Sequence, residues 1–150
     1  MQTSVHGNRT ETQIRAVVEE WAEAHRVKDA RRVVSQLAPG EVQFTLAPPL
    51  QHTGANARDE KAVASWFAGF EGPMGYEVRD LAITAGEDTA FCYFLNRLSA
   101  TTKYQQTFAL WNRVTFGFRK LEGRWLITHV HASVPFYMDG SFRAAVDLQP

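Results

Sequence analysis

The spacing of the apolar residues changes once along this chain, and that change restricts the fold more than any other feature. In the first half, apolar residues recur at intervals of three and four, as at Ile14, Val17, Val18 and Trp21, which is typical of helices. From Tyr76 onward they alternate every second residue, which is typical of strands. The turns between these later segments are short and therefore require antiparallel pairing. The pattern predicts helices followed by an antiparallel meander, an α+β domain with helices on one face of the sheet.

Breaker and capping residues divide the chain further. Thr10 opens the first predicted helix, Asp29 caps a second, and Asn56 opens a third. A sheet of long strands must curve around the first helix, so a cone with an internal cavity is expected where helix and sheet diverge. The predicted organisation is a flexible arm over 1–9, one domain over 10–136 and a tail over 137–150. The predicted strands cover 42–46, 50–53, 76–84, 89–100, 104–120 and 125–134.

Composition excludes several classes of protein. The 16 basic and 16 acidic side chains cancel, which argues against nucleic acid as a partner. No run of 18 apolar residues is present and the first residues contain no apolar signal segment, so we expect no membrane association and a cytoplasmic location. The single cysteine, Cys92, allows no internal disulfide and no multi-cysteine zinc site.

The aromatic content is high, with four Trp and ten Phe, and alternation divides these rings between two surfaces. The even-numbered residues of the last two strands are mostly apolar and are assigned to the concave, helix-covered face. We expect a pocket there for a small hydrophobic molecule, cyclic or aromatic, oriented by Asn112, Thr128 and Tyr93. The predicted pocket wall consists of Trp21, Phe44, Trp66, Phe67, Tyr93, Leu95, Asn112, Val114, Phe116, Thr128 and Val130.

The odd-numbered residues of the same strands mix polar and aromatic side chains. A sheet face of this kind is typical of a subunit interface, and we expect a homodimer through Arg113, Trp125, His129 and His131. The pair His129 and His131 has a spacing that also suits a metal ion, but no further imidazole is tied to it by spacing. An interface role is favoured, and neither a metal nor another cofactor is expected.

Carboxylates are absent from the predicted strands that wall the pocket. No Asp or Glu occurs between Asp88 and Glu122, and none occurs over 125–134. A pair of carboxylates acting as acid and base is therefore not expected. If the protein is an enzyme, His25 and Tyr93 are the candidate catalytic residues.

The order of elements and the end of the chain together resemble a known superfamily. The segment from Arg113 to Pro135 contains a Gly-x-Trp…His-x-His…Pro pattern, here Gly123, Trp125, His129 and His131. This is similar to the terminal signature of the SnoaL-like branch of the nuclear-transport-factor-two-like superfamily. The resemblance covers about residues 10–136 and implies a cystatin-like cone of the ketosteroid isomerase type.

The catalytic residues of ketosteroid isomerase have no equivalents at the matching positions of this sequence. The resemblance implies that Trp21 stands where that enzyme has an oxyanion-hole tyrosine, that its base falls near Thr45 or Leu46, and that its second donor falls near Phe116. The arginine cluster of the related kinase association domain falls near Phe116 and Ala132 and is absent as well. Isomerisation by the carboxylate mechanism is therefore not expected.

Three hypotheses follow from these observations. The first is a binding protein for a small hydrophobic molecule, without catalysis. The second is an isomerase, lyase or cyclase that uses a histidine base on a hydrophobic cyclic substrate. The third is an assembly module similar to the kinase association domain.

Overall fold

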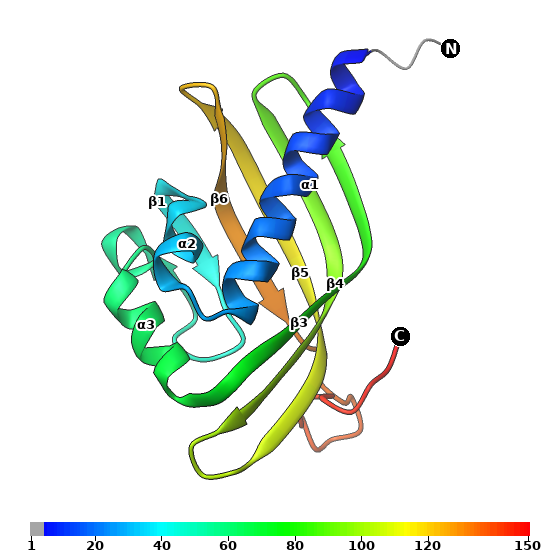
Figure 1. The fold of residues 1–150 in the computed structure, drawn as a ribbon. Helices are drawn as coiled ribbons and strands as arrows, with labels where there is room; N and C mark the ends of the chain where they lie inside the picture. Colours follow the sequence, from blue (N-terminus) through cyan, green and yellow to red (C-terminus); the bar gives the residue numbers. More distant parts are fainter. Residues whose placement is uncertain (1–4) are drawn as a thin grey trace.

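The computed structural model describes residues 5–150 as helices packed on one face of a single curved sheet (Figure 1). Strand order in the sheet is β2-β1-β6-β5-β4-β3, and all neighbours are antiparallel except β1 and β6, which are parallel. The elements are α1 (Val5–Arg26), α2 (Ala30–Ser35), β1 (Leu37–Phe44), β2 (His52–Thr53), the 3₁₀ turn η1 (Gly54–Asn56), α3 (Glu60–Ala68), β3 (Phe70–Ala85), β4 (Thr89–Thr102), β5 (Thr107–Leu121) and β6 (Arg124–Ser133).

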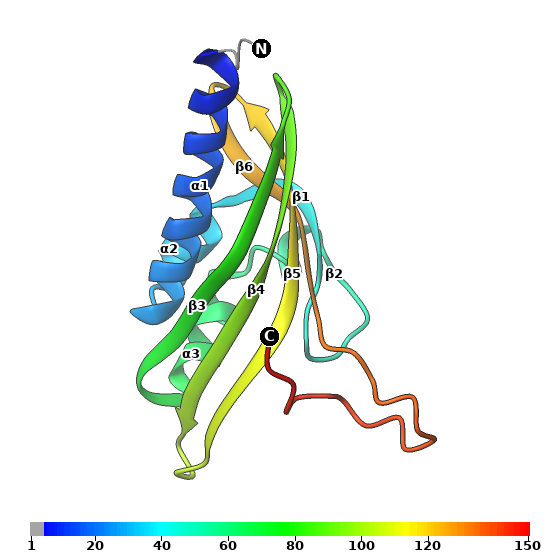
Figure 2. The same cartoon turned by 90° about the vertical axis from the view of Figure 1, so that its right-hand side faces the viewer.

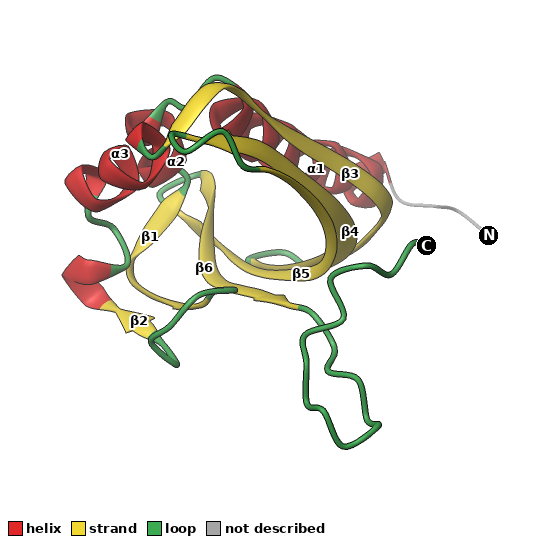
Figure 3. Ribbon diagram, turned by 90° about the horizontal axis from the view of Figure 1, so that it is seen from below, coloured by secondary structure: helices red, strands yellow, loops and turns green. Residues whose placement is uncertain are grey.

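The sheet curves through an open arc, with the helices gathered along one side of it (Figure 3). Helix α1 runs along the concave face, while the opposite, convex face carries no helix (Figure 2). The predicted α+β cone, a strongly curved sheet around a long N-terminal helix, is confirmed. One detail differs, because the parallel pairing of β1 with β6 makes the sheet mixed rather than wholly antiparallel.

The helices form where the sequence combines apolar residues at helical spacing with a capping side chain. Ile14, Val18 and Trp21 are buried along one side of α1. Asp29 caps α2, since its side chain accepts a hydrogen bond from the backbone N–H of Arg32. Helix α3 begins at Glu60, four residues after the expected start at Asn56, because Asp59 caps it.

The two ends of the chain differ from the expectation. Residues 1–4 of the predicted flexible arm lie outside the described part of the chain, and from Val5 the backbone is helical, so α1 begins before Thr10. The predicted tail is a hairpin, in which Phe136 and Ala144 form an isolated antiparallel bridge. It projects away from the convex side of the sheet (Figure 2).

A bulge in β6 changes which residues face the helices. Phe116 pairs with Val130 and Gly117 with His129, but Phe118 pairs with Ile127, so Thr128 is an extra residue in the ladder. Before the bulge the odd-numbered residues of β6 point to the concave face, and after it the even-numbered ones do. Simple alternation along the whole strand is therefore wrong for its first half.

Among residues 5–150, no helix is both long and apolar enough to cross a membrane.

Candidate functional site

The candidate site is a cavity of about 540 Å³ between the concave face of the sheet and the helices. Trp21 and His25 from α1, Val63 and Trp66 from α3, and Asn112 from β5 contribute to its wall. The loop after β1 closes one side. The described residues that line the cavity include no Asp, Glu, Lys or Arg, so the wall is apolar with a few uncharged polar groups.

Five of the predicted pocket residues line this cavity, namely Trp21, Trp66, Asn112, Val114 and Val130. Phe67 and Phe116 are fully buried behind the wall and belong to the core. Phe116 contacts Trp21 edge-on, with 5.3 Å between ring centroids, and so supports the indole from behind.

Four predicted pocket residues lie elsewhere, and the pocket assignment is corrected for them. Tyr93 and Leu95 are on the convex face, because Tyr93 pairs with Thr115 and Leu95 with Arg113, and antiparallel partners share a face. The buried row of β4 is the opposite of the predicted one and consists of Cys92, Phe94, Asn96 and Leu98.

Phe44 and Thr128 are the other two. Phe44 packs against His129 and His131, with centroid distances of 4.8 and 5.3 Å, on the convex side. Thr128 is the bulged residue. Its hydroxyl lies 3.4 Å from the point that the Cβ of a side chain at Gly117 would occupy. That position is on the convex side of β5, so Thr128 points away from the cavity.

The predicted interface residues also separate. Trp125 is turned inward by the bulge, is buried, and donates a hydrogen bond from Nε1 to Oε1 of Gln13 at 3.1 Å, so its assignment to the outer face is wrong. Arg113 and His131 are exposed on the convex face. His129 is half-buried there, with Nδ1 2.7 Å from the Val42 carbonyl oxygen. Among residues 5–150, no three His, Cys, Asp or Glu side chains gather closely enough to hold a metal ion.

His25 lies on the cavity wall among aromatic rings, with centroids 4.8 Å from Trp21 and 5.0 Å from Tyr76. Its Nδ1 is 2.7 Å from the Trp21 carbonyl oxygen. Because a carbonyl only accepts, Nδ1 carries the hydrogen and Nε2 of the neutral ring keeps a free lone pair. Burial lowers the pKa of His25 to about 4, partly offset by this hydrogen bond, so the ring is neutral at physiological pH.

Tyr76 also lies on the cavity wall, although it is not among the residues predicted from the sequence. Its hydroxyl oxygen accepts a hydrogen bond from Trp21 Nε1 at 3.1 Å, and burial raises its pKa. The hydroxyl hydrogen has no acceptor among residues 5–150, so Tyr76 retains a donor at the cavity wall. The sequence feature that could have indicated Tyr76 as a wall residue is a tyrosine in an otherwise apolar row of β3.

Asn96 and Asn112 are directly opposite each other on β4 and β5, and both are buried on the cavity wall. Asn112 Nδ2 donates to the Asn96 carbonyl oxygen at 3.3 Å, and the Oδ1 atoms of both side chains have no partner in the described structure. Asn96 is not among the predicted wall residues, because the alternation of β4 was assigned to the opposite face of the sheet. The pair adds uncharged polar groups to the wall.

Glu41 is a buried carboxyl group just behind the cavity. Gln43, which lines the cavity, donates a hydrogen bond to it at 2.5 Å. Burial raises the pKa of Glu41 to about 7, against the lowering effects of Gln43 and of the Arg58 charge. Because Glu41 does not reach the wall, it orients the Gln43 amide rather than contacting the cavity contents.

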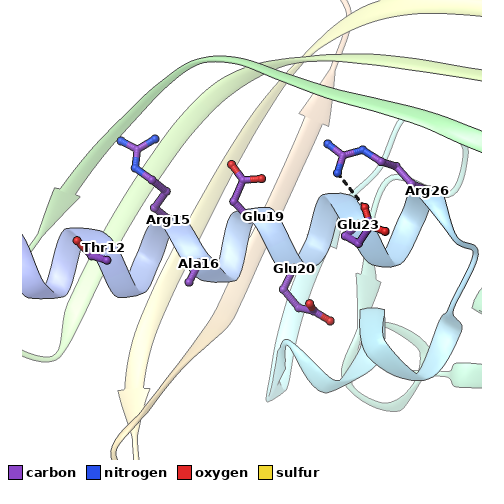
Figure 4. Close-up of a pocket in the computed structure, with 7 residues that line it drawn as sticks. All are labelled: Thr12, Arg15, Ala16, Glu19, Glu20, Glu23 and Arg26. Carbon is purple, nitrogen blue, oxygen red and sulfur yellow. Dashed lines mark hydrogen bonds and ion pairs between the residues drawn. The ribbon is translucent and has the colours of Figure 1, made fainter.

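A second hollow lies on the side of α1 that faces away from the core (Figure 4). It is open and lined by charged side chains, among them Glu20, Glu23 and Arg26. Arg26 pairs with Glu23 at 3.1 Å, and Glu20 pairs with Arg32 at 2.7 Å. These three charges are already partnered on a solvated helix surface, so the cavity between the sheet and the helices is the candidate site.

With this geometry the chain can be compared with known proteins. The family model described as SnoaL-like domain matches residues 14–137, and the chain belongs to this family. No curated protein matches the chain.

Solved structures share the fold over nearly the whole chain. A nuclear transport factor 2-like protein of unknown function from Pseudomonas putida KT2440 is 29% identical, with a TM-score of 0.83 over 95% of this chain and 98% of that one. A candidate scytalone dehydratase from Novosphingobium aromaticivorans is 14% identical, with a TM-score of 0.77 over 94% and 95%. A nuclear transport factor 2-like superfamily protein from Salmonella enterica serovar Typhimurium is 16% identical, with a TM-score of 0.74 over 89% and 96%. The last two likenesses show the fold alone.

Proposed function

We propose that this protein binds an uncharged, ring-containing small molecule in the cavity between α1, α3 and the concave face of the sheet. The observation that carries the proposal is a wall of aromatic and aliphatic side chains without a charged group among the described residues that line it. Cavities of this size and character are the usual form of small-molecule sites. A charged ligand would lose its hydration there without gaining a counter-charge.

Two polar groups of the wall, on Tyr76 and His25, indicate which hydrogen-bonding groups the ligand carries. Tyr76 offers a hydroxyl hydrogen, so a carbonyl or ether oxygen of the ligand accepts from it. His25 Nε2 offers a lone pair, so a hydroxyl or N–H group of the ligand donates to it. The neighbouring rings supply flat apolar surface for stacking. A cyclic molecule with one acceptor and one donor matches Tyr76 and His25.

The test uses N-phenyl-1-naphthylamine, a neutral aromatic probe with one N–H donor. Titration with purified protein should give a saturable rise in probe fluorescence. Ala62 lines the cavity from α3 and is exposed, so Ala62→Trp should narrow the mouth and weaken binding by about tenfold or more, without disturbing the core.

Ala64→Trp is the matched control, because Ala64 is on the same helix, equally exposed, and does not line the cavity. It should bind the probe as the unchanged protein does. A probe that does not saturate, or equal effects of the two substitutions, would contradict the proposal.

A second candidate function is an isomerase, lyase or cyclase with His25 as general base. The Nε2 lone pair of His25 favours it, because the His25 ring lies 5.0 Å from the Tyr76 ring, centroid to centroid, and both residues line the cavity. A base and a hydrogen-bond donor on the same wall suit proton abstraction beside a carbonyl group. A pKa of about 4 makes this imidazole a weak base at neutral pH, which is why binding is preferred. If a substrate is found, His25→Ala should abolish turnover; an unchanged rate would remove this candidate.

A further inference from the structure

The last residues of the chain form an ordered projection, Pro135–Leu148, which we call the C-terminal arm. The backbone N–H of Tyr137 donates to the Arg143 carbonyl at 2.8 Å, and that of Ala145 donates to the Pro135 carbonyl at 2.8 Å. Asp139 closes the turn, because its carboxylate accepts from the backbone N–H of Ser141 at 2.9 Å and from the Ser141 hydroxyl at 2.6 Å. The arm therefore has a defined shape.

The arm exposes apolar side chains that its own chain does not cover. Phe136 is 61% exposed, Met138 85% and Phe142 66%, and Val146 and Leu148 are also exposed. Figures 2 and 3 show the tip of the arm extending away from its own sheet, while the last residues of the chain turn back toward it. A two-stranded hairpin alone is marginally stable in water, and clustered exposed apolar side chains mark an interaction surface.

The convex face of the sheet is complementary to the arm in polarity and in charge. Phe91 and Tyr93 are exposed on it, and so are Arg97, Arg113 and Arg119. Strands β4, β5 and β6 contain no Asp or Glu, and on β3 the exposed Glu77 lies directly opposite Arg97. The arm carries two carboxylates, Asp139 and Asp147, against one cation, Arg143. The arm is thus apolar with an excess of one negative charge, and the convex face over β4, β5 and β6 is aromatic and basic.

We infer that the C-terminal arm docks on the convex sheet face of a second copy of this chain. Two-fold pairing lets each copy supply an arm and receive one, so both exposed apolar surfaces are covered by the same contact. The net charge of the chain is zero, so no overall repulsion opposes self-association. This inference is independent of the cavity and gives the dimer expected from the sequence a specific contact.

Light scattering coupled to size-exclusion chromatography tests the arm first. The unchanged chain should elute with the mass of a dimer, and Phe136→Ser with Phe142→Ser should raise the dimer dissociation constant at least about tenfold. The matched control is Leu50→Ser with Tyr104→Ser, since these two side chains are 96% and 89% exposed but belong neither to the arm nor to the convex face of the long strands. The control should remain dimeric, and circular dichroism should be the same for all three proteins.

Mixing tests where the arm docks. Phe91→Ser with Tyr93→Ser should dissociate the dimer as the arm variant does. An equimolar mixture of the arm variant and the face variant retains one intact arm-to-face contact per pair, so it should form more dimer than either variant alone. A monomeric unchanged chain, a dimer that survives the arm substitutions, or a mixture that restores nothing would each overturn the inference.

Discussion

The two faces of the sheet are made from alternate residues of the same strands, yet they differ completely in environment. In β5, the row Asn112, Val114, Phe116 and Phe118 is buried against helices and cavity, whereas Arg113, Thr115 and Arg119 of the alternate row are exposed. On the concave face burial excludes charge and leaves uncharged hydrogen-bonding groups around a cavity. On the convex face the side chains remain free to meet another molecule. One strand therefore serves two surfaces with separate requirements.

The largest expected effect compares adjacent residues on the two faces. Phe116→Ala removes a fully buried ring that contacts Trp21 and Phe94, and it should lower the free energy of unfolding by about 3–5 kcal/mol. Thr115→Ala, one residue away but exposed, should change it by about 0.5 kcal/mol or less. Urea denaturation of both variants measures the difference, and similar losses would contradict the division between the faces.

The next effect concerns pH and belongs to the concave face. The unfolded chain protonates His25 near the ordinary pKa of 6.5, whereas the folded chain resists protonation until about pH 4. The unfolded state therefore binds more protons in this window, and the stability conferred by neutral His25 is present above pH 6.5 and is lost as the pH falls toward 4. The loss should be about 3 kcal/mol.

His25→Gln removes the titrating group while keeping a side chain that can donate a hydrogen bond. Glu41, whose raised pKa of about 7 adds stability as the pH falls, titrates in both proteins, so the difference in unfolding free energy between the unchanged protein and His25→Gln reports on His25 alone. Measured at intervals from pH 8 to pH 4, the stability of the unchanged protein relative to this variant should decrease by about 3 kcal/mol. His131→Gln, on the exposed convex face, is the control and should keep the pH profile of the unchanged protein. Parallel profiles for the unchanged protein and His25→Gln would show that His25 is not buried as described.

The smallest effect tests the bulge at Thr128. Simple alternation places Trp125 and His131 on one face, but the bulge turns only Trp125 inward. Trp125→Phe loses the hydrogen bond to Gln13 and part of a buried ring, and it should cost about 1–2 kcal/mol. His131→Phe should change stability by about 0.5 kcal/mol or less. Equal effects in thermal or urea unfolding would place the two residues on the same face.

Much of the fold could be predicted because it depends on local signals. Helical spacing placed Ile14 and Trp21 in the core, Asp29 marked the start of α2, and the Gly-x-Trp…His-x-His…Pro pattern indicated the family. The candidate site was predicted only in part. Trp21, Trp66 and the even-numbered residues of β5 follow from periodicity, whereas Tyr93 and Leu95 were assigned to the wrong face of β4.

The remaining differences between the prediction and the structure depend on strand pairing, which no local sequence pattern specifies. Strand parity has two possible readings wherever both rows carry rings, and only pairing with β5 selects Asn96 rather than Tyr93 for the cavity. The bulge that buries Trp125 also depends on the register between β5 and β6.

The sequence by itself determined the class of fold, the absence of net charge and the surplus of aromatic rings, because these follow from composition and from spacing along one segment. The tertiary structure alone decided which rings enclose the cavity, that Tyr76 and Asn96 join His25 on its wall, and that the last residues project as an arm. Those outcomes depend on register and curvature, which arise only when segments far apart in the chain pair with one another.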